Sequence, residues 1–280
     1  MKQELQKKVD TAITLLRAAA GNDVVEVAYS GGKDSEVILE LAKMSSIKYR
    51  AIYKNTTIDP PGTIKHCYEK GVEVVAPKMT FIDLVRKHGM PTRRARFCCR
   101  VLKEYKILDK AVHGVRRAES TARTKRYNED DPIICRKYRG KNQHVNLILP
   151  ILSWTLQDVT EFIDARGIKC HPIYYDEQGN FHGERRLGCI GCPLKSDNGR
   201  ADFKMYPKMF RQICEAEIYW WHTHPQAKSH KKFGSPYGLI AHNIFYNKYA
   251  EWKADDINLF GQTDWKAFLE EYFCINLPNY

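Results

Sequence analysis

The sequence lacks any apolar run long enough to cross a membrane. A spanning helix needs about twenty consecutive apolar residues, and the 280-residue chain contains no such stretch. The N-terminal residues carry acidic side chains and no long apolar segment, unlike a secretory signal. They instead place Val9, Ile13 and Leu16 on one face of an amphipathic helix. We therefore expect a cytoplasmic protein with no membrane partner.

Internal repeats and low-complexity tracts are also absent, and a disulfide framework is not expected. The chain has nine cysteines, but a reducing compartment disfavours disulfides. Metal binding or catalysis is then the better explanation for cysteines that cluster. The clustered pairs are Cys98 with Cys99, and Cys189 with Cys192. Four others have no partner at ligand spacing and are interpreted as structural: Cys67, Cys135, Cys170 and Cys214.

Positive charge is concentrated in one part of the chain. The formal net charge is +12. Residues 86–141 contain 18 Lys and Arg against 6 Asp and Glu, an excess equal to that of the whole chain. A solvated surface would alternate in sign, whereas a concentrated excess favours contact with phosphate or sulfate. The segment therefore predicts a nucleotide partner, a nucleic-acid partner, or both.

Strand-like and helix-like runs alternate through the first half of the chain. Residues 23–30, 48–55 and 72–77 have the composition of strands, and residues 33–44, 63–70 and 81–88 have helical periodicity. This alternation is typical of βαβ units with a parallel sheet. Residues 97–112 also look helical, and residues 111–117 are expected to lead into another strand. Residues 146–151 form an apolar run, and 156–167 form a helix stopped by Gly167. We expect an α/β fold with a mostly parallel twisted sheet flanked by helices.

The character of the sequence changes after about Cys170. Residues 171–200 are rich in Gly, Asp, Asn and Pro and are interpreted as an ordered loop. Residues 201–280 are dense in aromatic side chains at helical spacing, which we assign mostly to a core. We therefore expect a nucleotide-binding domain at 1–195 and a helical, aromatic-rich extension at 196–280.

Residues 30–35 read SGGKDS and join a predicted strand to a predicted helix. A helix N-terminus offers free N–H groups, and glycines let an anion approach them. Lys33 adds a positive charge, and Asp34 tolerates a phosphate when Mg²⁺ lies between them. The Walker A pattern needs Ser or Thr after Gly-Lys, so this is a different loop. The expected phosphate-binding residues are Ser30, Gly31, Gly32, Lys33, Asp34 and Ser35.

SGGKDS resembles the PP-loop of the ATP pyrophosphatase superfamily. GVRRAES (114–120), PILSWTLQDVTEFI (150–163) and HPIYYDEQG followed by GCIGCP resemble segments of its sulfonucleotide reductases, the adenylyl-sulfate and phosphoadenylyl-sulfate (APS and PAPS) reductases. The resemblance implies an adenine nucleotide alpha-hydrolase-like fold that binds ATP or a related nucleotide. It further implies that Lys33 and Asp34 act on the phosphates and Mg²⁺, and that Arg116 and Arg117 face the other end of the substrate.

The clustered cysteines narrow the resemblance. A Cys-Cys pair followed by Cys-x-x-Cys is similar to the [4Fe–4S]-bearing reductases, which implies that Cys98, Cys99, Cys189 and Cys192 hold a cluster. The same four thiolates suit Zn²⁺, although adjacent cysteines are awkward zinc ligands. Ordinary buried thiols are the third interpretation.

One feature of the reductases is absent: their C-terminal Glu-Cys-Gly-Leu-His motif. This chain has EEYFCINLPNY, in which Phe273 and Ile275 flank Cys274 and predict a buried thiol. We therefore favour an ATP pyrophosphatase that adenylates a substrate for sulfur transfer from a sulfur donor. Residues 86–141 would then contact a nucleic-acid backbone undergoing thiolation.

Two further hypotheses stay open. The second is a sulfonucleotide reductase that releases sulfite with a thioredoxin-like reductant, and the third is a non-catalytic nucleotide-binding redox sensor. His113 and His171 are candidates for proton transfer, but a lone histidine is more often a packed or surface residue.

Overall fold

The computed structural model describes residues 2–127, 131–138, 141–245 and 264–280. The chain forms two compact units. The first unit contains residues 1–55, 59–77 and 100–188, and the second contains 56–58, 78–99 and 189–280. The predicted domains, 1–195 and 196–280, have different bounds from these two units, and the predicted division stays a prediction.

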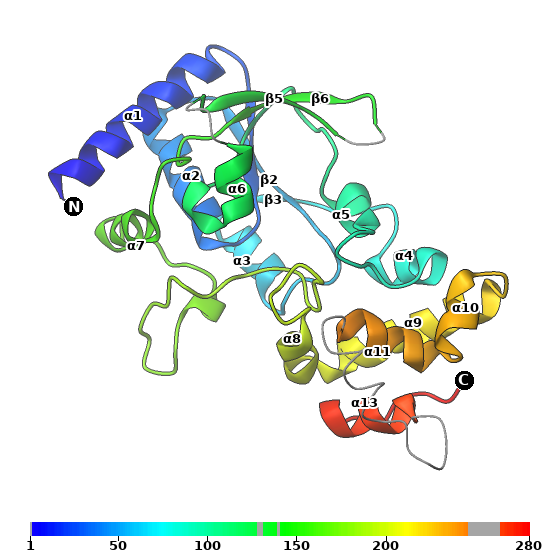
Figure 1. The fold of residues 1–280 in the computed structure, drawn as a ribbon. Coiled ribbons are helices and arrows are strands. Elements are labelled where there is room, and N and C mark those ends of the chain that lie inside the picture. The colour runs from blue at the N-terminus through cyan, green and yellow to red at the C-terminus, as the bar shows by residue number, and fades with distance from the viewer. Residues whose placement is uncertain (1, 128–130, 139–140, 246–263) are drawn as a thin grey trace. The chain divides into compact units, whose positions relative to one another are not determined.

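The first unit is built on a six-stranded sheet (Figure 1). The strands are β1 (Val25–Tyr29), β2 (Tyr49–Lys54), β3 (Glu73–Val75), β4 (Lys110–Val112), β5 (Ile133–Lys137) and β6 (His144–Ile148). Their order is β3-β2-β1-β4-β6-β5, and only the β5–β6 pair is antiparallel. This confirms the predicted α/β fold with a mostly parallel sheet. The chain reverses its direction of winding between β1 and β4, and α/β proteins bind ligands at such a point.

Helices α1 (Gln3–Ala20), α2 (Lys33–Ser45) and α7 (Leu156–Ala165) pack together beside the sheet (Figure 1). Helix α1 buries residues at a spacing of three and four, as an amphipathic helix must. Helix α7 begins at a capping box of Thr155 and Asp158, and Gly167 follows its end with φ +60°. The first unit also contains α3 (Thr63–Glu69) and α6 (Thr121–Arg126), and α5 (Phe97–Leu102) runs across a boundary between the units.

The predicted helix over 97–112 is wrong beyond Leu102. Helix α5 ends there, and Lys110 begins strand β4. Ala111 and Val112 are buried where β4 pairs with β1 on one side and β6 on the other. This tertiary pairing outweighs the local helix preference. The hairpin strand β5 was not anticipated either, whereas the apolar run at 146–151 corresponds in part to β6.

The second unit is helical. Its helices are α4 (Phe81–His88), α8 (Arg200–Met205), α9 (Pro207–Thr223), α10 (Lys228–Phe233), α11 (Pro236–Ile244) and α13 (Trp265–Phe273). Phe210 lies at its centre, with ring centroids 4.7 Å from Phe203 and 4.4 Å from Phe273. The helical C-terminal part is thus confirmed, with aromatic side chains in its core. Tyr246 and Trp252 lie outside the described residues, and Tyr219 is exposed.

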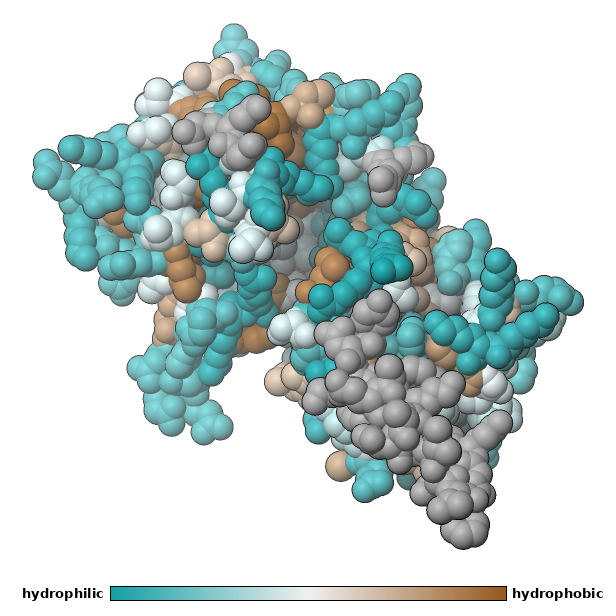
Figure 2. All heavy atoms as spheres, in the orientation of Figure 1, coloured by the Kyte–Doolittle hydropathy of each residue, from teal (hydrophilic) through white to brown (hydrophobic). Residues whose placement is uncertain are grey.

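Within the described part of the chain, no helix is long and apolar enough to span a membrane. Figure 2 shows one face on which hydrophilic residues predominate and hydrophobic residues form small, separate patches. The large exposed hydrophobic side chains are scattered along the sequence, from Val24 to Tyr280. Single exposed apolar residues of this kind are normal on a protein surface.

Candidate functional site

The SGGKDS segment forms the connection between β1 and α2. Gly31 has φ +75°, a backbone conformation that other residues rarely adopt. Gly32 precedes helix α2 and has no side chain to cap it, but the hydroxyl of Tyr174 accepts a hydrogen bond of 3.1 Å from the Lys33 N–H. The Ser35 hydroxyl donates to the Gly32 carbonyl at 2.7 Å. The loop is therefore held by a contact from Tyr174 and by a hydrogen bond within the loop itself.

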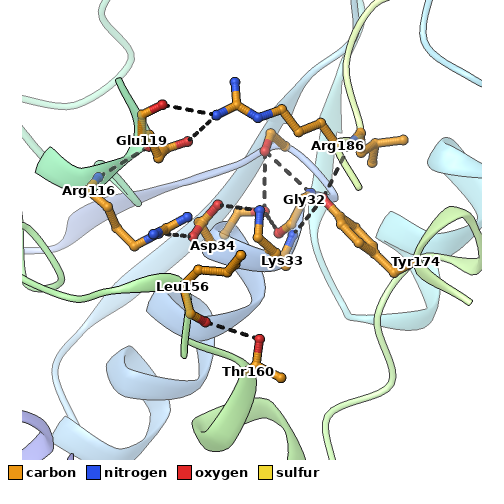
Figure 3. A network of polar contacts seen from close by, with 12 residues as sticks. Gly32, Lys33, Asp34, Arg116, Glu119, Leu156, Thr160, Tyr174 and Arg186 are labelled. Atoms are coloured by element: carbon orange, nitrogen blue, oxygen red, sulfur yellow. Dashed lines mark hydrogen bonds and ion pairs between the residues drawn. The ribbon is translucent and has the colours of Figure 1, made fainter. Parts of the chain in front are cut away.

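Asp34 lies between two cations (Figure 3). Its carboxylate is 3.2 Å from the Lys33 ammonium and 2.5 Å from Nε of Arg116. The Lys33 and Arg116 side chains are each 5% exposed. Burial lowers the pKa of Lys33, while Asp34 opposes that shift. The structure thus brings together three predicted site residues, of which Arg116 lies 82 positions beyond Asp34 in the sequence.

Gly114 explains how the segment after β4 reaches this loop. A Cβ atom on Gly114 would lie 2.8 Å from the carbonyl oxygen of Asp34. Contacts that short are not tolerated against backbone atoms, so only glycine fits. The glycine of GVRRAES therefore permits the close approach that places Arg116 beside Asp34.

A second ionic cluster lies beside the first and was not anticipated from the sequence. Glu119 forms an ion pair with Arg123, and one of its oxygens is 4.0 Å from the guanidinium of Arg186. Arg186 also donates to the Glu119 carbonyl at 3.3 Å. Arg123 follows GVRRAES closely, and Arg186 belongs to the segment interpreted as an ordered loop. The excess of arginine in those segments was the only signal.

The predicted residue Arg117 does not line the cavity described below. Its N–H donates to the Leu152 carbonyl at 2.9 Å. Arg116 does not line that cavity either, and acts on it through Asp34. Arg116 has an extended backbone whereas Arg117 begins the 3₁₀ helix Arg117–Glu119, so the two adjacent arginines have different surroundings.

A buried polar network supports helix α2 below the loop. Glu36 is 2% exposed and accepts a hydrogen bond from the Tyr29 hydroxyl. Its carboxylate is also 2.5 Å from Nε2 of His66 and 3.4 Å from the Lys70 ammonium. His171 packs edge-on against His66 and accepts from the Ile173 N–H, so it is a packed residue. This network holds the first turns of α2 against β1 and α3.

A cavity of about 460 Å³ opens at the phosphate loop, within the range of small-molecule sites. Five of the six loop residues line it, and Gly31 does not. Arg123, Arg186 and Glu119 line it as well. Further lining residues come from the strands and from the ends that follow them: Glu26, Ala28, Ile52, Lys54 and His113. All of these residues belong to the first unit.

The four clustered cysteines all belong to the second unit. Cys98, Cys99 and Cys189 interact: a hydrogen bond to Cys99, burial and the nearby Cys189 together raise the pKa of the Cys98 thiol. Arg96 donates to Sγ of Cys99 at 3.6 Å, and Sγ of Cys189 donates to the Thr56 hydroxyl at 3.7 Å. Three of the four predicted ligands are thus neighbours.

The loop that carries Cys189 and Cys192 folds tightly on itself. A Cβ atom on Gly199 would lie 2.4 Å from the Cα atom of Gly191, and both glycines have positive φ. Arg93 holds the loop to the segment before α5, since its guanidinium donates to the Asn198 side chain at 3.0 Å and to the Lys195 carbonyl at 2.7 Å. The two cysteine pairs are therefore anchored to each other.

Within the described part of the chain, the clustered cysteines are not arranged as a metal-binding set. Among the residues that the structure describes, no three Cys, His, Asp or Glu side chains are arranged to hold a metal ion. The donor chemistry suits an iron–sulfur cluster, since Cys₄ is its usual ligand set. Cys98, Cys99 and Cys189 are therefore near one another, but the described residues do not form a complete four-cysteine ligand set.

The remaining cysteines differ from one another. Cys67, Cys170 and Cys214 are buried, as structural thiols are, but Cys135 is exposed on β5, 3.8 Å from Nδ1 of His144. The prediction that Cys274 is buried is wrong. Cys274 follows helix α13 with φ +51°, which directs its side chain away from the core that buries Phe273.

The basic segment 86–141 is divided between the two units. Several of its cations serve internal ion pairs: Lys110 with Asp23, Arg116 with Asp34, Arg123 with Glu119, and Arg136 with Glu104. Others, such as Arg94 and Arg126, are exposed. Residues 128–130 and 139–140 lie outside the described residues. Nucleic-acid contact through this segment stays a prediction.

Comparison with known proteins identifies the family. Residues 25–195 match the phosphoadenosine phosphosulfate reductase domain. The chain belongs to the phosphoadenosine phosphosulfate reductase family. The family domain includes the phosphate loop, the GVRRAES segment and all four clustered cysteines. Helices α8, α9, α10, α11 and α13 lie beyond it.

Comparison also finds one protein sequence and two solved structures that are similar to this chain. An "uncharacterized 37.8 kDa protein in gpa 5'region" of Escherichia phage 186 is 29% identical over 166 residues, which cover 53% of this chain and 46% of that protein. The structure of a phosphoadenylyl-sulfate reductase from Candida auris is 18% identical, with a TM-score of 0.43, over 65% of this chain and 97% of that one. Candida glabrata FMN adenylyltransferase is 14% identical, with a TM-score of 0.43, over 67% and 62% of the two chains.

Proposed function

We propose that this phosphoadenosine phosphosulfate reductase-family protein binds ATP and is an ATP pyrophosphatase that adenylates a substrate for sulfur transfer. The observation that carries the proposal is the cavity at the SGGKDS loop, lined by Lys33, Arg123 and Arg186. Three cations around one cavity of nucleotide size suit a polyphosphate. The matching residues 25–195 support an adenine nucleotide as its carrier.

The chemistry assigns a role to each charged group. A substrate oxygen bonds to the α-phosphorus, its proton passes to solvent, and the bond to the β-phosphate breaks so that pyrophosphate leaves with the electron pair. Lys33, Arg123 and Arg186 stabilise the charge that develops on the phosphates. Arg116 holds Asp34 in the loop, so it is a positioning residue. A sulfur nucleophile then displaces AMP from the adenylated substrate.

Mg²⁺ is expected with the nucleotide. Asp34, which lines the cavity, is the loop carboxylate that would hold it. Bound Mg²⁺ would neutralise phosphate charge. Asp34 is already paired with Lys33 and Arg116, so the loop accepts a phosphate next to this carboxylate before any metal binds.

The test is the formation of AMP and pyrophosphate from ATP. The protein is incubated with ATP, Mg²⁺, a sulfide donor and DNA or tRNA in separate reactions, and both products are quantified. We expect turnover with one acceptor and none in the Lys33→Met variant. Wild-type protein that forms no AMP under any of these conditions would contradict the proposal, and tight nucleotide binding without turnover would instead favour a nucleotide-binding redox sensor.

We further propose that Cys98, Cys99, Cys189 and Cys192 hold a [4Fe–4S] cluster, with zinc as the alternative. The proposal is supported by their common unit and by the proximity of Cys98, Cys99 and Cys189. Iron, zinc and acid-labile sulfide are counted after anaerobic purification, together with a visible spectrum. Cys189→Ser should lose the metal, and Cys135→Ser, at an exposed cysteine outside the cluster, should keep it.

The exposed thiol of Cys274 supports a second candidate function, sulfonucleotide reduction. A nucleophilic cysteine must be accessible, and Cys274 is. Sulfite release from adenylyl sulfate or phosphoadenylyl sulfate, with thioredoxin as reductant, is the readout. Activity that is lost in Cys274→Ser would establish this function in place of ATP cleavage.

A further inference from the structure

A groove lies on the surface of the second unit, between helices α4 and α9. Figure 1 shows these two helices side by side. The groove has a volume of about 640 Å³ and shares no residue with the cavity at the phosphate loop. It is lined by residues of α4, by residues of α9 and by the residue after α9: Asp83, Arg86, Lys87, Glu215, Tyr219, Thr223 and His224.

Buried contacts fix the two walls of the groove at the end of α4. Glu217 on α9 is 1% exposed and accepts from the Met90 N–H. A Cβ atom on Gly89 would lie 3.3 Å from the Glu217 carboxylate and equally close to the Trp220 ring, so the turn after α4 packs directly on α9. A groove with fixed walls loses little conformational entropy when a ligand binds.

Positive charge collects around this groove. Arg86 and Lys87 are exposed near the end of α4, and Lys87 has no ion pair with any described residue. Residues 222–234 contain three lysines and three histidines but no acid. Trp221 holds this segment to α9, since its ring stacks on His230 with the centroids 3.7 Å apart. A positive surface of this kind suits a polyanion.

The two acids of the groove are neutralised on their own helices. Asp83 accepts hydrogen bonds from Thr80, which lower its pKa, and lies 3.8 Å from the Arg86 guanidinium. Glu215 is 3.1 Å from Nε of Arg211. Ion pairs between such exposed side chains are weak, so Arg86 can exchange Asp83 for a phosphate at small cost.

Tyr219 presents an aromatic ring among these cations. Its side chain is 55% exposed, and no ring of a described residue stacks on it. The neighbouring Trp220 ring, in contrast, stacks on His224 with the centroids 5.2 Å apart. Single-stranded nucleic acids stack their bases on such rings while cations contact the backbone. An acidic peptide would use the cations but would leave the ring without a role.

We propose that the groove between α4 and α9 binds a single-stranded nucleic acid. A base stacks on Tyr219, and phosphates contact Arg86, Lys87 and the lysines of residues 222–234. Helix α9 lies outside the matched residues 25–195, so this surface belongs to the helical extension of the chain. The inference deepens the proposed function, on which the role of the nucleic acid as the acceptor rests.

The test is the binding of fluorescein-labelled oligothymidylate and oligouridylate, each of about fifteen nucleotides, to the full chain without ATP. Fluorescence anisotropy should show binding of at least one of them. Tyr219→Ala should weaken binding about tenfold, whereas Tyr219→Phe, which keeps the ring, should bind like wild type. Lys87→Gln should weaken binding about threefold and lower the slope of log K against log[salt] by about 0.7.

Tyr68→Ala, at an exposed tyrosine of α3 outside the groove, is the matched control and should bind like wild type. Thermal melts establish that each variant is folded. Wild-type protein that binds neither oligonucleotide, unchanged binding by Tyr219→Ala, or displacement of the oligonucleotide by polyglutamate at equal charge overturns the inference. These reactions contain no ATP, so such failures leave the proposed ATP site intact. Oligonucleotide binding without any AMP formation contradicts the proposed function alone.

Discussion

The phosphate loop of the first unit and the cysteine loop of the second unit are both tight turns organised by glycine, but they hold their functional groups differently. Around the phosphate loop, Asp34 and Glu119 already pair with the cations that would meet a ligand. Around Cys189 and Cys192, the backbone and Arg93 hold the loop, while the thiols themselves form no closed ligand set within the described residues.

This difference has a physical origin. Arginine and lysine cannot be left buried without counter-charges, so the first unit has to supply them itself. Thiols at neutral pH are uncharged and tolerate burial, so the second unit needs only to bring them near each other. A site for anions is therefore preorganised before binding, whereas a site made of thiols can be completed by its metal.

Gly199→Ala should have the largest effect and tests the rigidity of the cysteine loop. Its Cβ atom would clash with Gly191, and its φ of +82° disfavours any side chain. We expect a loss of about 3 kcal/mol in the free energy of unfolding, measured by chemical denaturation. Gly234→Ala is the matched control, since Gly234 has a similar φ but open space around it. Equal losses in both variants would mean that the loop is not packed as described.

Lys33→Met tests the phosphate loop, the site that is preorganised for an anion. Loss of a buried cation that contacts phosphate should weaken ATP binding about a hundredfold, measured by calorimetry. Lys110→Met, which removes a lysine that pairs with Asp23 outside the cavity, should bind like wild type. A change of less than about threefold in Lys33→Met, under 1 kcal/mol, would show that the loop lysine does not meet the ligand.

Glu217→Gln probes a buried carboxyl group in the second unit. Glu217 accepts from the Met90 N–H at 2.5 Å, and burial raises its pKa to about 8. In the folded protein it is protonated at neutral pH, whereas in the unfolded chain it ionises above its ordinary pKa of 4.5. Its contribution to stability is therefore complete below pH 4.5 and is lost as the pH rises towards 8.

Between about pH 5.5 and 7.0 this group should lower the free energy of unfolding by about 2 kcal/mol. Thermal melts over that range measure how the stability of wild type and of Glu217→Gln changes with pH. The substitution should remove the contribution of Glu217 to this change. An identical slope in the two proteins would mean that Glu217 is ionised in the folded state.

Glu119→Gln should have the smallest effect. Glu119 competes with a phosphate for Arg123 and Arg186, so its neutralisation should tighten ATP binding about threefold, with less gain at high salt. Glu73→Gln, at an exposed glutamate paired with Arg50 outside the cavity, serves as control. Weaker binding in Glu119→Gln would show that the carboxylate positions the arginines and does not compete with the ligand.

The parts of the structure that could be predicted are those that depend on residues close together in the sequence. SGGKDS lies within six positions between a buried strand and an amphipathic helix, so its place at the turn was predictable. The start of strand β4 at Lys110, inside the predicted helix, was not, because Ala111 and Val112 are strand residues through pairing with β1 and β6. Local preference carries no information about such partners.

The site follows the same rule. Lys33 and Asp34 were predicted from the loop itself, and Arg116 from a resembling segment. Arg123 and Arg186 were missed because nothing in their own segments shows that they face the loop. The burial of Cys274 was mispredicted from Phe273 and Ile275, because a left-handed residue after a helix does not follow the helical pattern.

The hydrogen bonds from Lys33 and Leu187 to the Tyr174 hydroxyl have a consequence for synthesis of the chain. A ribosome makes residues 30–35 before the partners of this loop. Arg116 follows Asp34 by 82 positions, and Tyr174 follows Lys33 by 141 positions. The nascent loop therefore stays incomplete until Tyr174 has been translated. A fragment that stops before Tyr174 would contain the whole motif but leave its lysine N–H without this acceptor.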